Sequence, residues 1–141
     1  MTSERRPERL EPLAGAIARG AEAQARLIEA AGGLLSLEGV ATLIGIALTK
    51  VDAQRAAGRL LALQIRDDWT YPAAQFRDGE VLDGIPEVIA SMADASAWSI
   101  LDFLLAPDDA LGGQAPIAAL RVSGFGAVQR LLASRQADAF V

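Results

Sequence analysis

The spacing of apolar and polar positions predicts a long helix near the start of the chain. Between residues 10 and 31, apolar positions recur at intervals of three and four residues, as on one face of an α-helix. Residues 1–9 are predicted to be frayed, and Gly32-Gly33 is predicted to end the helix. We favour packing of the stripe on the rest of the chain, with dimerisation as the alternative. The stripe consists of Leu10, Leu13, Ile17, Ala21, Ile28 and Ala31, interrupted by Gln24.

Two short helices are predicted next. Ser36 is a suitable N-cap for a helix over 37–44, and Gly45 is a stop signal after it. A second helix is predicted from Leu48 or Thr49 to about Ala57, closed by Gly58. Two short helices around a tight, glycine-containing turn describe a helix-turn-helix.

A small hairpin is predicted after these helices. The apolar runs 61–65 and 69–71 flank the polar turn Arg66-Asp67-Asp68, and Pro72 ends the second run. Short apolar runs around a polar turn are typical of a two-stranded wing. The predicted fold class is therefore mainly α, with a helix-turn-helix, a small two-stranded wing and a C-terminal helical module.

The final part of the chain alternates helices with sharp breaks. Helices are predicted from about Gly84 to Met92, around Trp98, from Pro116 and around residues 125–132. Most of their apolar residues are expected to form core. The break around Leu111-Gly112-Gly113, with Asp108, Asp109 and Gln114 beside it, is less easily explained by core packing. We expect it to be an exposed surface of specific shape.

Composition disfavours an enzyme. The chain has 141 residues, of which 52% are hydrophobic, and this is enough for one packed domain or two very small ones. It has no cysteine and no histidine, the usual residues of nucleophilic, acid–base and zinc chemistry. We therefore expect no catalytic residue, no metal site and no cofactor. Because neither a signal peptide nor a membrane-length apolar run is visible, the expected location is cytoplasmic.

Charge is distributed unevenly along the chain. The net charge is −5; residues 1–30 carry five Arg and five Glu, whereas residues 78–141 carry three Arg against nine Asp or Glu. Residues 31–77 have a small positive excess, so this is the only part of the chain where a basic patch could form. The acidic C-terminal part is expected to favour a basic partner.

Candidate DNA-binding residues lie on the second helix of the helix-turn-helix and in its flanks. Gln pairs readily with adenine and Arg with guanine, while flanking cations hold phosphates. The wing tip departs from the usual basic pattern, because Asp67 and Asp68 occupy it. A winged helix-turn-helix retained only for folding is the alternative to DNA binding. The candidates are Thr49, Lys50, Gln54, Arg55, Arg59 and Arg66.

Two segments resemble known families. Residues 34–72 resemble the winged helix-turn-helix of excisionase and MerR-type proteins. The sequence FLLAPDDALGGQAPIAAL, residues 103–120, resembles the C-terminal toxin-binding domain of the Xre/MbcA/ParS antitoxins. The connector is similar to a YP-x-x-QF signature in a branch of that family, matched by Tyr71, Pro72, Gln75 and Phe76.

The resemblance implies an antitoxin of a type II toxin–antitoxin system. Its partner would be a RES-domain toxin that consumes NAD, whose nucleotide site the antitoxin covers, and operator DNA of the shared operon. A homodimer or a toxin–antitoxin hetero-oligomer is expected. The rival functions are a stand-alone winged-helix regulator without a toxin and an adaptor whose helix-turn-helix does not bind DNA.

The resemblance also implies a division of the chain and a toxin-facing surface. The expected parts are an N-terminal helix at 1–33, a winged helix-turn-helix at 34–77 and a helical toxin-binding domain at 78–141. The residues expected to face the toxin are Pro107, Asp108, Asp109, Leu111, Gly112, Gly113, Gln114, Pro116 and Leu120.

Overall fold

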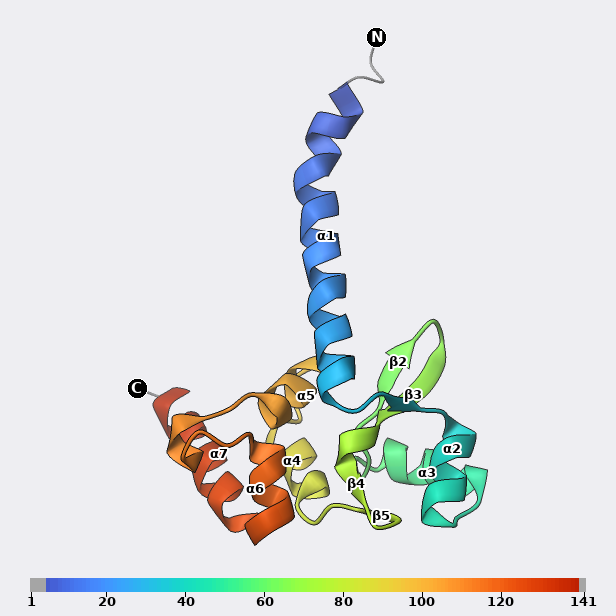
Figure 1. The fold of residues 1–141 in the computed structure, drawn as a ribbon, viewed down its shortest axis with the longest axis vertical. Coiled ribbons are helices and arrows are strands. Elements are labelled where there is room, and N and C mark those ends of the chain that lie inside the picture. The colour runs from blue at the N-terminus through green and yellow to red at the C-terminus, as the bar shows by residue number, and fades with distance from the viewer. Residues whose placement is uncertain (1–4, 140–141) are drawn as a thin grey trace.

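A long N-terminal helix stands away from the rest of the molecule (Figure 1). The structure is a computed structural model that describes residues 5–139, with side chains described for 14–137. The helix, α1, runs from Arg5 to Ala30 and so begins earlier than the periodicity predicted. The expected frayed start is wrong for residues 5–9, and residues 1–4 lie outside the described residues.

The packing of α1 on the body is confined to its end. Within residues 14–26 every residue is exposed except the half-buried Gly15, and Ile17 is 64% exposed. Leu27 and Ile28 are partly buried and the following Ala31 is fully buried, where the end of α1 meets α5 (Ala97–Leu105). The favoured packing of the whole stripe on the chain's own body is therefore wrong, because the helix leaves the body about one turn above its end. The side chains of Leu10 and Leu13 lie outside the described range.

The predicted winged helix-turn-helix is present. Helices α2 (Leu37–Ile44) and α3 (Leu48–Ala56) follow one another around the Gly45 turn. The Ser36 hydroxyl caps α2 by accepting a hydrogen bond of 3.0 Å from the Gly39 backbone N–H. Strands β2 (Leu63–Ile65) and β3 (Asp68–Pro72) form the antiparallel wing. A third strand, β1 (Leu34–Leu35), pairs with the other edge of β3 and was not predicted.

A short connector carries the chain from the wing to the C-terminal helices. The 3₁₀ turn η2 (Ala73–Gln75) is followed by a ribbon of β4 (Phe76–Arg77) and β5 (Glu80–Val81). Asp78 and Gly79, the two residues between these strands, both have positive φ, as a tight hairpin turn requires.

The C-terminal part is helical, as predicted. It consists of α4 (Ile85–Ser91), α5, the 3₁₀ turn η3 (Asp109–Leu111), α6 (Pro116–Ser123) and α7 (Gly126–Ala139). Ser96 caps α5, and Pro116 begins α6 at the position where a missing N–H costs least. None of the helices in the described part of the chain is long and apolar enough to cross a membrane. The mainly helical fold class is confirmed.

Two clusters of buried side chains hold the body together. The smaller lies inside the helix-turn-helix and contains Val40, Val51 and Tyr71. The larger is built from α4 to α7, but it also contains Leu61 and Leu63 from the edge of the wing. The larger cluster therefore contains residues from both sides of the predicted boundary between 34–77 and 78–141.

Gln75 fastens the connector to the wing. Its side chain is 1% exposed; Oε1 accepts a hydrogen bond from the Leu61 N–H at 2.8 Å, and Nε2 donates to the Leu61 carbonyl at 2.7 Å. Nε2 also donates to the Pro72 carbonyl at 3.2 Å. The amide thus occupies the place of a neighbouring strand, which satisfies backbone groups that would otherwise be buried without partners.

Two arginines join the connector to α6. Arg77 donates to the Arg121 carbonyl at 2.9 Å, and Arg121 donates to the Ala74 carbonyl at 3.0 Å. Each guanidinium therefore donates a hydrogen bond to a backbone carbonyl on the other side of the junction between the connector and α6. These contacts, with the shared core, fix the C-terminal helices against the winged helix-turn-helix.

Candidate functional site

The exposed face of α3 carries few polar groups. Thr49 and Lys50 are exposed in its first turn, and Gln54 is half-buried. Arg59 is exposed beyond the end of the helix, and Arg66 is exposed at the wing tip. The six predicted DNA-binding residues are thus spread over both ends of α3 and the wing.

Arg55 has a contact inside the molecule. Its guanidinium carbon lies 4.2 Å from the centre of the Trp69 ring in the wing, and its Nη2 lies 3.8 Å from the Asp52 carboxylate. The side chain is 22% exposed, and Nε is buried without a hydrogen-bond partner. A guanidinium held over an indole and beside a carboxylate is poorly placed to reach a base edge. Its position ties α3 to the wing.

Tyr71 lies in the same buried region. Its side chain is 0% exposed, and its hydroxyl makes no hydrogen bond of acceptable geometry. Burial raises the pKa of Tyr71 above its ordinary value; the nearby Arg55 charge opposes this rise and the Asp52 carboxylate adds to it. Tyr71 was noticed in the sequence as part of the YP-x-x-QF motif, and all four motif residues are buried.

An acidic hollow lies between α2, α3 and the wing. It measures about 440 Å³ and is lined from these elements by Glu38, Asp52, Asp67 and Asp68, with no Lys or Arg among its lining residues. These are all the acidic residues of the segment 34–77. Carboxylates gathered beside α3 repel phosphates. The acidic wing tip is visible in the sequence, whereas the approach of Glu38 and Asp52 to it depends on the tertiary fold.

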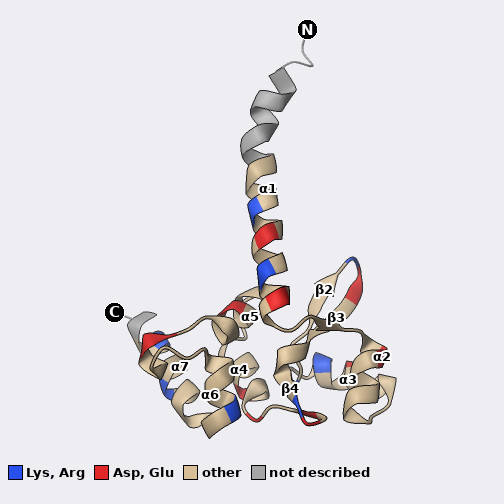
Figure 2. Cartoon of the chain, viewed as in Figure 1, with Lys and Arg blue, Asp and Glu red and all other residues tan. Residues whose placement is uncertain are grey.

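The basic residues of the same segment do not gather. Lys50 and Arg59 lie at opposite ends of α3, and Arg55 is covered by the wing. Arg77 is engaged with the Arg121 carbonyl at the C-terminal junction. The basic residues of this part of the chain are therefore spread over α3, the wing and the connector (Figure 2).

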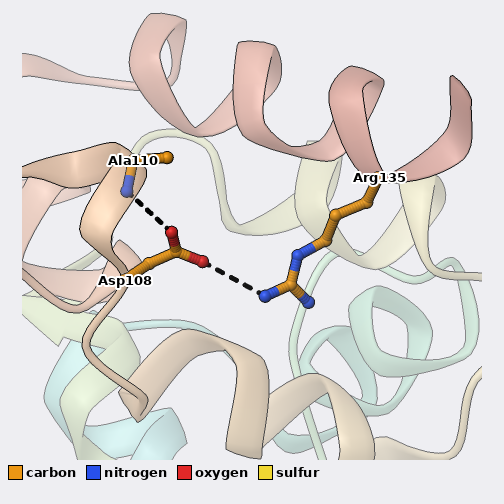
Figure 3. A network of polar contacts seen from close by, with 3 residues as sticks. All are labelled: Asp108, Ala110 and Arg135. Atoms are coloured by element: carbon orange, nitrogen blue, oxygen red, sulfur yellow. Dashed lines mark hydrogen bonds and ion pairs between the residues drawn. The ribbon is translucent and has the colours of Figure 1, made fainter. Parts of the chain in front are cut away.

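The corner between α5 and α6 is held by Asp108. Its Oδ1 accepts a hydrogen bond from the Ala110 N–H at 2.9 Å, and its Oδ2 lies 3.2 Å from Arg135 Nη2 of α7 (Figure 3). The Asp108 backbone N–H also donates to the Gln114 carbonyl, and the Gly113 N–H donates to the Asp108 carbonyl, each at 3.0 Å. These two hydrogen bonds close the loop on itself. The Arg135 guanidinium lies 4.9 Å from the centre of the Phe103 ring. The corner is therefore a built and ordered feature.

The predicted toxin-facing residues differ in exposure: some are exposed, some are half-buried, and two are buried. Pro107, Asp109, Gly112, Gly113 and Gln114 are exposed, as predicted, and form the outer surface of the corner. Leu111 is half-buried, and the Asp108 side chain, 21% exposed, is turned to Arg135.

Pro116 and Leu120 are corrections to the prediction. Both are buried, and Leu120 is 4% exposed. The first turn of α6 passes beneath the corner, so that the inward face of the helix joins the core of the C-terminal part. These two residues support the corner and do not contribute to its surface.

The comparisons with known proteins give one structural likeness. No protein-family model and no curated protein matches the chain. Among solved structures, the chain is similar to the NMR structure of Rv2175c, with a TM-score of 0.62 and 23% sequence identity. The likeness covers 72% of this chain and 80% of Rv2175c. At this level of identity the two proteins share the fold, and the fold alone is shown.

Proposed function

We propose that this chain is an antitoxin that binds a RES-domain toxin through the corner between α5 and α6. The observation that carries the proposal is an exposed loop braced by hydrogen bonds within itself and by a contact with α7. Asp109, Gly112, Gly113 and Gln114 are exposed, while Asp108 and Arg135 fix the loop from behind. A pre-ordered loop loses little conformational freedom on binding, and this favours affinity.

Charge supports a basic partner at this surface. Residues 78–141 carry nine acidic residues against three arginines, and one of those arginines, Arg121, is engaged at the junction with the connector. A toxin that consumes NAD needs a cleft that accepts phosphate groups, so its surface is expected to be basic there. An acidic loop seated at that cleft would exclude the nucleotide.

The toxin proposal is tested by binding and by relief of NAD loss. If the proposal holds, a cognate RES-domain toxin should co-purify with this chain and should stop depleting NAD when the two are co-expressed. The double variant Asp109→Ala with Gln114→Ala should weaken the complex at least tenfold at an unchanged Tm. Asp94→Ala, an exposed acidic residue away from the corner, is the matched control. Failure of the unaltered chain to bind or to relieve NAD loss contradicts the proposal.

Gly112 allows a sharper test. Its φ is +69°, and a Cβ there would meet nothing within 4 Å. Asn tolerates this left-handed conformation better than most residues. Gly112→Asn is therefore expected to place a new side chain on the corner and block the toxin, with a Tm close to that of the unaltered chain. If binding is unchanged, the partner does not contact the corner.

DNA binding by the same protein is a second, narrower proposal. The winged helix-turn-helix fold favours it, and Thr49 and Lys50 are exposed at the start of α3, where bases or phosphates could be contacted. With so few free cations, operator binding would need more than one copy of the chain.

The DNA proposal is tested with the operon's own promoter at near-physiological salt. Lys50→Ala should weaken specific binding and lower its salt dependence, whereas Arg55→Ala should lower the Tm because it removes the Trp69 contact. If neither the chain nor its toxin complex selects the promoter over unrelated DNA, the adaptor function is favoured. The acidic hollow beside α3 is the observation that supports this alternative.

A further inference from the structure

We propose that α1 is a self-association helix, and that its partner is α1 of a second copy of this chain. The proposal rests on three features of the described residues: an apolar face that the chain leaves uncovered, a hollow at the foot of the helix, and a local charge balance that differs from the rest of the molecule. It does not depend on the proposed toxin.

The face is uncovered from Ala16 to Ala23 and again at Ala30, while Leu27 between them is half-buried against the body. Ala16, Gly20, Ala23, Leu27 and Ala30 recur at alternating spacings of four and three residues, the repeat by which one helix packs along another. Ile17 borders this row and is 64% exposed. From Ala16 to Ala30 the row extends about 21 Å at 1.5 Å per residue. Helices in proteins gain most of their stability by packing an apolar face, so a face of this length calls for a partner.

A hollow at the foot of α1 continues the same row. It measures about 290 Å³ and is lined by Ala23, Leu27 and Ala30 of α1 and by Leu105 and Ala106 at the end of α5. One side of the hollow is therefore formed by α1, and the other side by the end of α5. The small side chains of this row let a second backbone approach closely. A helix lying along α1 would enter this hollow at its lower end.

Charge favours a second copy of the chain over a strongly charged partner. Among the described side chains of α1, the charges of Arg19, Glu22, Arg26 and Glu29 sum to zero, and the hollow at its foot adds only Asp102 of α5. The whole chain has a net charge of −5, so two copies repel one another over most of their surface. The α1 surface is neutral, with both signs interspersed (Figure 2). DNA would require a positive excess here and a basic protein a negative one; a second α1 requires neither.

The first experiment measures the mass of the full chain in solution. Sedimentation at about 0.15 M salt should give a dimer for the unaltered protein. Ala23→Glu should give a monomer, because it places a charge in the paired row. The matched control Ala25→Glu, on the opposite side of the helix, should remain a dimer. Since both positions are exposed in one copy, the melting of the body should be unchanged in either variant.

The second experiment uses the absence of cysteine from the chain. Single Cys substitutions at Ala16, Gly20 and Ala23 should form disulfide-linked dimers on mild oxidation, while Ala18→Cys and Ala25→Cys should not. Crosslinking at all three row positions indicates parallel helices, and crosslinking at one indicates antiparallel helices; both outcomes support the second copy. A monomeric unaltered chain at 100-micromolar concentration, or equal crosslinking on both sides of the helix, overturns the proposal.

Discussion

At the scale of the residue, Gln75 is the buried polar side chain on which the connector depends. Gln75→Leu removes a donor and an acceptor and leaves the Leu61 N–H and both carbonyls without partners. Each buried group left unpaired costs about 1–3 kcal/mol, so the loss of unfolding free energy is expected to be roughly 3–5 kcal/mol. Urea denaturation measures it. Gln64→Leu is the control, because Gln64 lies exposed on β2 and its replacement should change stability by less than about 0.5 kcal/mol.

Tyr71 makes a second prediction at this scale, on the dependence of stability on pH. Burial raises the pKa of Tyr71 in the folded chain, so above about pH 10 the unfolded chain loses this proton while the folded chain keeps it. The folded state then binds more protons, and the free energy of unfolding must fall as the pH rises from 10 toward the folded pKa. Below pH 10 this group contributes no slope.

The single tyrosine of the chain makes the measurement direct. Absorbance of the phenolate should report a midpoint above the ordinary one in the folded protein and an ordinary midpoint in urea. Tyr71→Phe should flatten the alkaline loss of stability. A tyrosine that ionises at the same pH in both states would contradict the buried hydroxyl.

At the scale of the element, the wing turn requires a backbone conformation that its two residues, Arg66 and Asp67, adopt unfavourably. Arg66 and Asp67 both have positive φ, 52° and 69°, which is the geometry of a two-residue type I′ hairpin turn. Asn-Gly is the preferred pair for this turn, so replacing Arg66 with Asn and Asp67 with Gly should raise the unfolding free energy by about 1 kcal/mol. Thermal denaturation checks this. Asp68→Gly is the contrasting variant: Asp68 lies in β3 with ordinary φ, and glycine there should destabilise the wing.

Elements whose signals are local could be predicted from the sequence. Ser36 and Gly45 bound α2, Pro116 begins α6, and apolar runs around a polar turn located the wing. Each depends on residues within a few positions of one another. The two-residue strand β1 has no such signal, because its partner Tyr71 lies far along the chain.

The candidate site was less predictable for the same reason. Arg55 was expected to face DNA, but its surroundings depend on Trp69, which the hairpin brings onto it. The resemblance placed Leu120 among the toxin-facing residues, but the face of α6 that carries it packs in the core. Asp108 is a comparable case, since its partner Arg135 comes from the last helix. Residue type indicated which contacts a side chain could make, and tertiary packing decided which side chains are exposed and available for a partner.

At the scale of the whole molecule, the main question is whether the winged helix-turn-helix and the C-terminal helices unfold together. Leu61 and Leu63 belong to the larger core cluster with α4 to α7. Arg77 and Arg121 bond backbone across the same junction. The winged helix-turn-helix has a small cluster of its own, but Leu61 and Leu63 are buried in the cluster of the C-terminal helices, so one cooperative transition is expected.

Two tryptophans, one on each side of the junction, allow this to be measured. Trp69 lies in the wing and Trp98 in α5, so Trp98→Phe leaves a reporter of the winged helix-turn-helix and Trp69→Phe leaves a reporter of the C-terminal helices. Because Trp69 contacts Arg55, its replacement should shift the midpoint, and each variant is therefore followed by both fluorescence and circular dichroism. Within each variant the two signals should give one urea midpoint. Separate midpoints would mean that residues 34–77 and 78–141 fold independently, and that a partner bound to one part need not influence the other.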